Sequence, residues 1–164
     1  MNFAFSDEQE ELRKVVKDFL NAKSSEATVR ELMETESGYD EAVWSQMGEQ
    51  MGLQGLIIPE EFGGSGYSYV ELIVVLEEMG RRLLCAPYFS TVVLAANTLL
   101  QSGDDAAKSE LLPGIASGET IATVAFTEPS GKWDEAGITL PATKSGDGFT
   151  LTGTKSFGRS SRTS

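Results

Sequence analysis

The sequence predicts an α+β protein in which a helical bundle domain is followed by a truncated antiparallel β domain. Up to residue 118 the apolar side chains recur at helical spacing, and after it they fall into short β-branched runs. A glycine-rich turn separates two of these later runs. We therefore divide the chain into a helical domain (1–118), the beginning of a β domain (119–157) and an unstructured tail (158–164).

The first helix is predicted from its amino-terminal signal and its apolar face. Ser6 and Gln9 form a capping-box pattern, and Asp7 and Glu8 place negative charge in the first turn, where the helix dipole favours it. The apolar residues then recur three and four positions apart, at Leu12, Val15, Val16, Phe19 and Leu20. This spacing predicts a helix with one buried face.

The middle of the helical domain contains the most apolar segment of the chain. Asp40 is the expected cap of a second helix, and the glycines of residues 60–66 indicate a loop after it. Residues 70–84 are apolar around nearly the whole helical circumference. Such a helix belongs in the centre of a bundle, and Pro87 is expected to end it.

Two more helices complete the predicted bundle. Residues 91–100 form a second apolar run and predict another buried helix. The turn at residues 102–104 then precedes a helix that is expected to run to Leu112, because Pro113 follows. The helical domain therefore contains about five helices by this count.

Three antiparallel strands are predicted after the helices. Residues 120–127 are small and β-branched, which is typical of a buried strand, and residues 138–143 form a short second run. Phe149 and Leu151 alternate with threonines in a third strand after the turn at residues 145–148. Residues 158–164 have no apolar residue and no periodicity, so we expect this tail to be unstructured.

The charge and composition exclude several classes of function. The net charge is −12, from 13 basic and 25 acidic residues, which makes nucleic acid a poor partner. The chain has no histidine and a single cysteine, Cys85, so it has neither an internal disulfide nor the usual ligands of a zinc site. No secretory signal pattern begins the chain and no apolar run approaches about 18 residues. We expect a cytoplasmic protein without a membrane span and without a metal.

Four short motifs, in a fixed order after a helical beginning, resemble the acyl-CoA dehydrogenases. They are Pro59-Glu60-Glu61-Phe62-Gly63-Gly64-Ser65-Gly66, Leu76-Glu77-Glu78-Met79-Gly80, Leu112-Pro113-Gly114-Ile115-Ala116-Ser117-Gly118-Glu119 and Ala125-Phe126-Thr127-Glu128-Pro129. The resemblance covers nearly the whole chain through Phe157. Residues 81–93 are most similar to the actinobacterial branch of the family, which acts on bulky acyl groups, including sterol side chains.

The resemblance implies a flavoprotein oxidoreductase of lipid metabolism and fatty acid β-oxidation. Its complete subunit has a helical domain, a small β domain and a second helical bundle, with FAD between the last two and a neighbouring subunit nearby. The substrate is an acyl-CoA, the electrons pass to an electron-transfer acceptor, and homo- or hetero-oligomers are expected. A glutamate takes the α proton while hydride leaves to the flavin. No residue of this chain matches that base, so the resemblance implies no catalytic residue here.

The resemblance also assigns three cofactor-binding residues. Thr127 matches a threonine that contacts the edge of the flavin ring, and Phe126 precedes it on the same wall. Phe157 falls where the family has a tryptophan lining the flavin. The alternative for Thr127 is a plain strand end before Pro129, and for Phe157 an aromatic that covers the core. Trp133 stands where the family has a serine that meets the pyrophosphate, which puts that contact in doubt.

Three functions remain open from the sequence. The first is a fragment of an acyl-CoA dehydrogenase that is inactive alone and holds no FAD by itself. The second is a non-catalytic partner subunit, and the third is a helical interaction domain without a cofactor. The basic, serine-rich residues 158–164 match nothing in the family and suggest a shifted reading frame, a truncated gene or an added tail.

Overall fold

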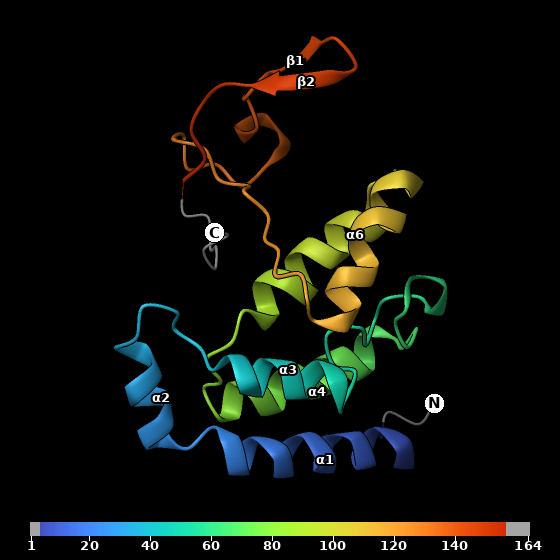
Figure 1. The fold of residues 1–164 in the computed structure, drawn as a ribbon, viewed down its shortest axis with the longest axis vertical. Helices are drawn as coiled ribbons and strands as arrows, with labels where there is room; N and C mark the ends of the chain where they lie inside the picture. Colours follow the sequence, from blue (N-terminus) through green and yellow to red (C-terminus); the bar gives the residue numbers. More distant parts are fainter. Residues whose placement is uncertain (1–3, 157–164) are drawn as a thin grey trace.

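The structure is a computed structural model that describes residues 4–156, and it confirms the predicted α+β class. The main helices are α1 (Asp7–Lys23), α2 (Glu26–Met33), α3 (Glu41–Glu49), α4 (Tyr69–Arg81), η2 (Phe89–Ala96), α5 (Asn97–Gln101) and α6 (Asp105–Ser117). Short 3-10 turns lie at η1 (Glu60–Phe62) and η3 (Glu135–Gly137), and β1 (Ala142–Ser145) pairs with β2 (Gly148–Leu151). Figure 1 shows the helices as one body, with the hairpin beyond them.

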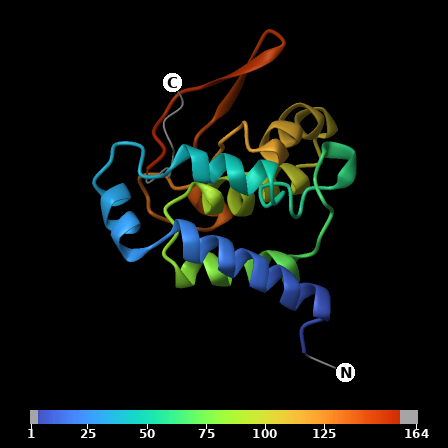
Figure 2. The same cartoon turned by 60° about the horizontal axis from the view of Figure 1, so that its bottom comes forward.

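Helix α1 begins as the sequence predicts and packs along α4. The Ser6 hydroxyl accepts from the Gln9 amide at 3.2 Å, while the Gln9 side chain accepts from the Ser6 amide at 3.0 Å, so the capping box is complete. Val16 and Leu20 are fully buried, and α1 lies beside α4 in both Figure 1 and Figure 2. Val15 is 46% exposed, so its predicted place in the buried stripe was wrong.

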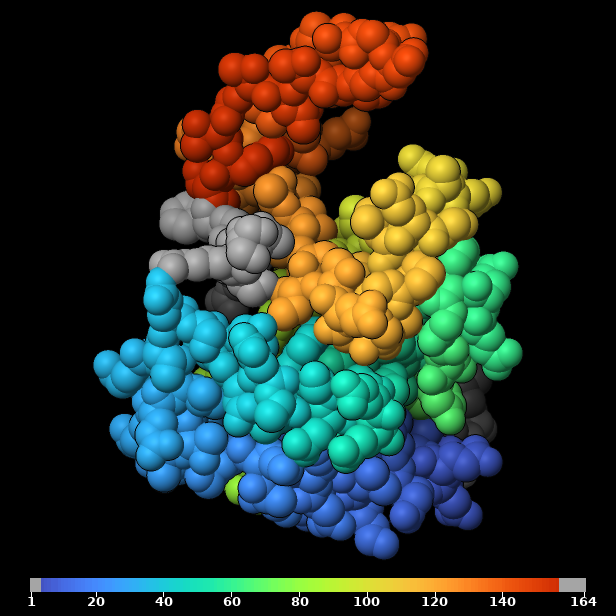
Figure 3. Space-filling model, in the orientation of Figure 1, coloured from blue at the N-terminus to red at the C-terminus, as the bar shows by residue number. Residues whose placement is uncertain are grey.

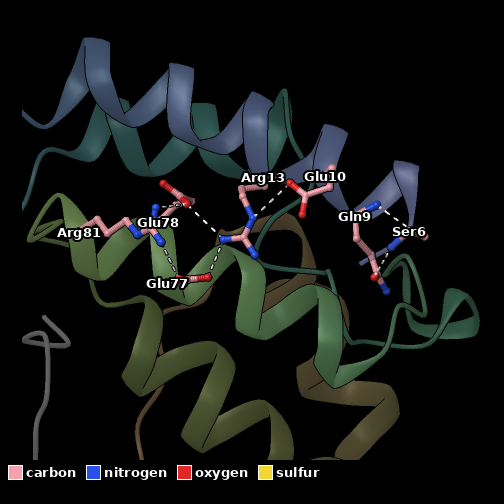
Figure 4. Close-up of polar contacts among 7 residues, drawn as sticks. All are labelled: Ser6, Gln9, Glu10, Arg13, Glu77, Glu78 and Arg81. Atoms are coloured by element: carbon pink, nitrogen blue, oxygen red, sulfur yellow. Dashed lines mark hydrogen bonds and ion pairs between the residues drawn. The ribbon is translucent and has the colours of Figure 1, made fainter. Parts of the chain in front are cut away.

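Salt bridges join α1 to α4 beside this apolar contact. The Arg13 guanidinium contacts Glu77 at 2.5 Å and Glu78 at 3.3 Å, and Figure 4 shows it reaching across from α1 to the two carboxylates of α4. Arg81 pairs with the same two carboxylates from within α4, at 2.6 and 3.3 Å. The Glu78 side chain is 2% exposed, so it is a buried charge held between two arginines.

Helix α4 is less enclosed than its apolar composition predicts. Leu72, Val75 and Met79 belong to the main core, but Val70 and Ile73 are 42% and 58% exposed. The helix also ends at Arg81 rather than continuing to Pro87. Packing elements therefore cover only part of its circumference, and among residues 4–156 its most extensive helix contact is with α1.

The predicted buried helix at residues 91–100 is real but is wound differently. It consists of the eight-residue π-helix η2 followed directly by α5. A π-helix has i→i+5 hydrogen bonds, is rare, and is frequently found at functional sites. Periodicity does not distinguish this winding from an α-helix over so few residues, so the sequence did not predict it.

Helix α6 continues through Pro113 to Ser117, which corrects its predicted end at Leu112. A proline inside a helix removes one backbone hydrogen bond. Here Leu112 and Ile115 are fully buried in a second core cluster, with Ile58 and Ala96. Burial of these side chains offsets the lost hydrogen bond, and Gly118 then ends the helix with φ of 83°.

The β region contains one hairpin instead of three strands among the described residues. Residues 120–127, predicted as a buried strand, are extended but have no ladder partner. The Thr91 side chain takes the place of a ladder there, accepting from the Ala122 amide at 3.2 Å and donating to the Ala122 carbonyl at 3.1 Å. The extended segment therefore docks on η2 rather than joining the sheet.

The predicted second strand starts four residues later than expected, and the third is confirmed. Ala142 pairs with Leu151 and Ser145 with Gly148, in antiparallel register. The amides of Thr139 and Leu140 donate instead to the Glu128 carboxylate, so they are not available to a ladder. Figure 3 shows the hairpin projecting from the helical body, and both of its strands are exposed.

Two buried aromatic side chains donate hydrogen bonds to distant backbone carbonyls of the helical region. The Trp44 indole donates to the Gly118 carbonyl at 2.8 Å, and the Tyr88 hydroxyl donates to the Leu53 carbonyl at 2.8 Å. Because Trp44 belongs to α3 and Gly118 caps α6, this bond fixes where the chain leaves the helices. Within residues 4–156 no helix is long and apolar enough to cross a membrane.

Candidate functional site

A cleft of about 550 Å³ lies between the η2–α5 helices and the extended chain that follows α6. Its lining residues come from two stretches that are distant in the sequence, namely Phe89, Leu94 and Thr98, and Thr123, Val124, Phe126, Thr127 and Trp133. We call it the Thr127 cleft. Its volume and its mainly apolar lining are typical of a site for a small molecule.

Two of the three residues predicted to bind a cofactor lie together in this cleft. Thr127 is 7% exposed and lines the cleft, as does its neighbour Phe126. The Ser156 amide donates to the Thr127 carbonyl at 2.7 Å, which brings the chain after the hairpin back to this wall. The third residue, Phe157, lies outside the described residues.

Trp133 also lines the Thr127 cleft, beside Phe126. The two rings are 6.1 Å apart between centroids and inclined by 59°, a tilted aromatic contact. Trp133 is nevertheless 79% exposed, so its outer face is open to solvent. The sequence drew attention to Trp133 only as a departure from a family pattern, and the structure shows it as part of an aromatic wall.

The opposite wall contains residues that the sequence did not single out. Phe89 and Leu94 lie on η2, and Thr98 lies on α5. In the sequence they are part of an apolar run, which predicts burial and not a ligand site. The Phe89 side chain is 52% exposed, and a large exposed aromatic beside a cleft is the signal that the structure adds.

The polar side-chain groups of the cleft lining are the threonine hydroxyls and the indole N–H of Trp133. The Thr98 hydroxyl donates to the Leu94 carbonyl at 2.8 Å, within its own helix. The Thr123 hydroxyl oxygen is buried and has no hydrogen-bond partner among residues 4–156. No ionisable side chain belongs to the cleft lining in the part of the chain that the structure describes. The cleft therefore offers apolar surface and hydroxyls, but neither a base nor a cation.

Glu128 lies next to Thr127 but makes its contacts away from the cleft lining. Its carboxylate accepts from Lys155 at 2.8 Å and from the Thr139 hydroxyl at 2.6 Å, and also from the amides of Thr139 and Leu140. The Lys155 hydrogen bond, followed by that of Thr139, lowers the pKa of Glu128 to about 2. A carboxylate with so little affinity for a proton is a poor general base.

Among residues 4–156 there is no group of three or more His, Cys, Asp or Glu side chains that could hold a metal ion. Cys85, partly buried, has its thiol near the Leu83 carbonyl at 3.8 Å.

Comparison with known proteins places this arrangement in a family. Residues 6–119 match the acyl-CoA dehydrogenase N-terminal domain. The chain belongs to the acyl-CoA dehydrogenase family. The acyl-CoA dehydrogenase IpdE2 of Mycolicibacterium smegmatis is 40% identical over 148 residues, which are 90% of this chain and 45% of that protein.

Solved structures of other proteins share the fold. The ChsE4-ChsE5 complex from Mycobacterium tuberculosis superposes with a TM-score of 0.81 at 29% identity, over 94% of this chain and 41% of that chain. The Tcur3481-Tcur3483 steroid ACAD gives a TM-score of 0.75 at 31% identity, over 96% of this chain and 41% of that chain. The chain thus spans less than half the length of each of these three proteins.

Complete acyl-CoA dehydrogenases bind FAD, and the Thr127 cleft fits one part of that cofactor. Phe126 and Trp133 offer flat apolar surface for a ring system, and Thr127, which also lines the cleft, carries a hydroxyl, a group that can donate to a polar ring edge. Trp133 has no hydroxyl and only one N–H donor, and no cation lines the cleft among the described residues. The residues present therefore fit the ring and provide nothing that holds a diphosphate.

Proposed function

We propose that the chain forms part of a flavin-dependent acyl-CoA dehydrogenase that oxidises the α,β bond of an acyl-CoA thioester. In this proposal a helical domain (1–118) and the beginning of a β domain (119–157) form one wall of the FAD site. Thr127 contacts the edge of the flavin ring, and Phe126 and Phe157 lie against the ring. The position of Thr127, 7% exposed on the wall of a cleft, carries the proposal.

In the proposed site this wall orients the cofactor and keeps water away from it. Bound FAD would supply the hydride acceptor. The Thr127 hydroxyl would donate to the polar edge of the ring, while Phe126 and Trp133 would cover an apolar part of it. Because the main chain here is held by hydrogen bonds to Ser156 and Lys155, these groups are positioned before a ligand arrives.

Proton abstraction in the proposed reaction requires a group from elsewhere. The described residues place no carboxylate in the Thr127 cleft, and the nearby Glu128 is fully engaged by four hydrogen bonds. We therefore propose that the 164-residue chain is inactive alone and is completed by another segment or subunit. A homo- or hetero-oligomer and an electron-transfer acceptor are part of this proposal.

The proposed substrate is an acyl-CoA with a bulky acyl group. The similar Tcur3481-Tcur3483 structure is a steroid ACAD, and the Thr127 cleft is mainly apolar. Phe89 and Leu94 on η2 provide apolar surface for such a group. A helical interaction domain without a cofactor history is not favoured, because the chain belongs to the acyl-CoA dehydrogenase family.

Riboflavin binding tests the cofactor part of the proposal. The purified chain is expected to carry no tightly bound flavin, since nothing in the described cleft holds a diphosphate. Added riboflavin should nevertheless shift the NMR signals of Thr127, Phe126 and Trp133, because the ring alone fits the cleft. Shifts confined to residues outside the cleft, or no shift at all, would contradict the assignment.

Two threonine variants provide the matched comparison. Thr127→Val should weaken riboflavin binding by about tenfold, because the hydroxyl donor to the ring edge is lost. Thr98→Val changes the other wall of the same cleft, where the hydroxyl already donates to Leu94, and should leave the affinity within about twofold. Equal effects of the two variants would mean that Thr127 has no special contact with the ring.

A further inference from the structure

The carboxylate of Glu128 joins three segments of chain that no strand ladder connects. Its Oε2 atom accepts from the Thr139 amide at 2.9 Å and from the Thr139 hydroxyl at 2.6 Å. Its Oε1 atom accepts from the Leu140 amide at 3.0 Å and from Lys155 Nζ at 2.8 Å. Both oxygens of the carboxylate are therefore satisfied, and the Glu128 side chain is 5% exposed.

Lys155 extends this cluster to the wall of the Thr127 cleft. Besides Glu128, its ammonium group donates to the Phe126 carbonyl at 3.2 Å. The next residue, Ser156, donates its amide to the Thr127 carbonyl at 2.7 Å. Residues 155–156 thus donate hydrogen bonds to two consecutive carbonyls of the cleft wall, those of Phe126 and Thr127.

In this region hydrogen bonds from side chains hold the backbone where a β-sheet would use a strand ladder. Among residues 4–156 the only strand pairing is that of the hairpin at 142–151, so residues 126–128 have no ladder to hold them. An ion pair with little exposure, 21% for Lys155 and 5% for Glu128, is weakly screened by solvent and has defined geometry. Such a pair can fix the direction of the backbone on which it acts.

We propose that Glu128 and Lys155 are positioning residues that orient the 126–128 backbone so that Phe126 and Thr127 face the cleft. The identity of the ligand rests on the proposed function, whereas the orientation of the backbone does not. Neither residue lines the cleft, so both act through Phe126 and Thr127. Glu128 thereby has a role in an acyl-CoA dehydrogenase site that is distinct from proton transfer.

Lys155→Met is the variant that tests the proposal on the full chain. It keeps the apolar stem and removes the ammonium group, so it cuts the link to both Glu128 and Phe126. In NMR relaxation, the amides of residues 126–128, 139 and 140 should become more mobile, while those of the helices stay unchanged. The contact between the Phe126 and Trp133 rings should weaken in the same sample.

Two further variants serve as controls. Lys132→Met removes the same charge from an exposed side chain of the same region and should leave residues 126–128 as rigid as in the unmodified chain. Lys155→Arg retains the charge and should restore much of the rigidity, although its planar group has different geometry. If Lys155→Met leaves residues 126–128 rigid, or loosens the helices equally, the positioning role is wrong.

Riboflavin titration of the same samples separates this proposal from the proposed function. If both are correct, Lys155→Met weakens riboflavin binding about tenfold, because residues 126–128 no longer hold Phe126 and Thr127 towards the ring. Lys155→Arg then recovers part of this loss in affinity. If riboflavin fails to shift Thr127 in the unmodified chain while Lys155→Met still loosens residues 126–128, the flavin assignment fails and the positioning role stands. If binding is unchanged by Lys155→Met although riboflavin shifts Thr127, the positioning role is overturned.

Discussion

Arg13 links α1 to α4, two helices that pack along each other. Its guanidinium contacts Glu77 and the buried Glu78 on α4, and it also lies 4.8 Å from the centre of the Phe5 ring. Burying a carboxylate is unfavourable unless it is paired and hydrogen-bonded. Arg13 therefore contributes most by compensating Glu78, and less by its exposed contacts (Figure 4).

Replacing Arg13 should destabilise the chain measurably. In Arg13→Ala, Glu78 stays buried with Arg81 as its remaining partner, and we expect a loss of about 2 kcal/mol in the free energy of unfolding. Urea denaturation followed by circular dichroism measures this loss. Arg30→Ala is the control, because Arg30 pairs with an exposed Glu26, and its effect should stay below about 0.5 kcal/mol. Equal losses in the two variants would contradict the role given to Glu78.

Single residues also show how far the sequence predicts local structure. The capping box of Ser6 and Gln9 was predicted and is confirmed, because both partners lie three residues apart. A family motif points to Thr127 and Phe126, and the structure places both on one cleft wall, while their binding role stays a prediction. The partners of Glu128 could not be predicted, since they lie 11 to 27 residues away.

At the scale of elements, the docking of residues 120–127 on η2 shapes the cleft. This segment has the composition of a strand, yet it pairs with the Thr91 side chain and not with another strand. Thr91 is fully buried on the π-helix, so its two hydrogen bonds to Ala122 are protected from water. The Thr91 hydroxyl therefore helps to hold the 123–127 wall against η2, together with the packing of Ile121 and Ala122 on the two core clusters.

Thr91→Val tests that contribution with a side chain of the same shape. The amide and carbonyl of Ala122 would lose their partner while the packing is nearly kept, and we expect a loss of about 1–3 kcal/mol in the free energy of unfolding. Faster hydrogen exchange at the Ala122 amide should accompany it. Thr98→Val, whose exposed hydroxyl bonds only within its own helix, should change stability by about 0.5 kcal/mol or less. An Ala122 amide that exchanges at the original rate would refute the docking role.

For the whole molecule, three carboxylates make folding sensitive to acid. The pKa of Glu71 is lowered first by the Ser68 hydrogen bond, that of Glu77 first by Arg13, and that of Glu128 to about 2 first by Lys155. A carboxylate with a lowered pKa binds fewer protons in the folded chain than in the unfolded chain. Its stabilising effect is therefore present above its ordinary pKa of 4.5 and is lost as the pH falls towards the lowered value.

Acid should accordingly loosen the contacts of Glu128 within a defined range of pH. The Glu128 cluster should remain ordered at pH 5 and lose its order between about pH 4.5 and 2, as the folded carboxylate takes up its proton. Amide signals of Thr139 and Leu140 followed against pH measure this directly. Glu128→Gln, which cannot titrate, should remove the pH dependence of those two amides. A midpoint near 4.5 in the unmodified chain would show that Lys155 and Thr139 do not hold the charge.

The sequence by itself determined the fold class, the capped first helix, the glycine-rich loop at 60–66, the third predicted strand and the family. These features depend on residues that are close together in the chain, or on short motifs, so periodicity and spacing reveal them. The tertiary structure alone decided the π winding of η2, the course of α6 through Pro113 and the pairing of Thr139 and Leu140 with Glu128. For α6, and for Thr139 and Leu140, a distant segment supplies burial or a hydrogen bond that outweighs the local preference of the chain.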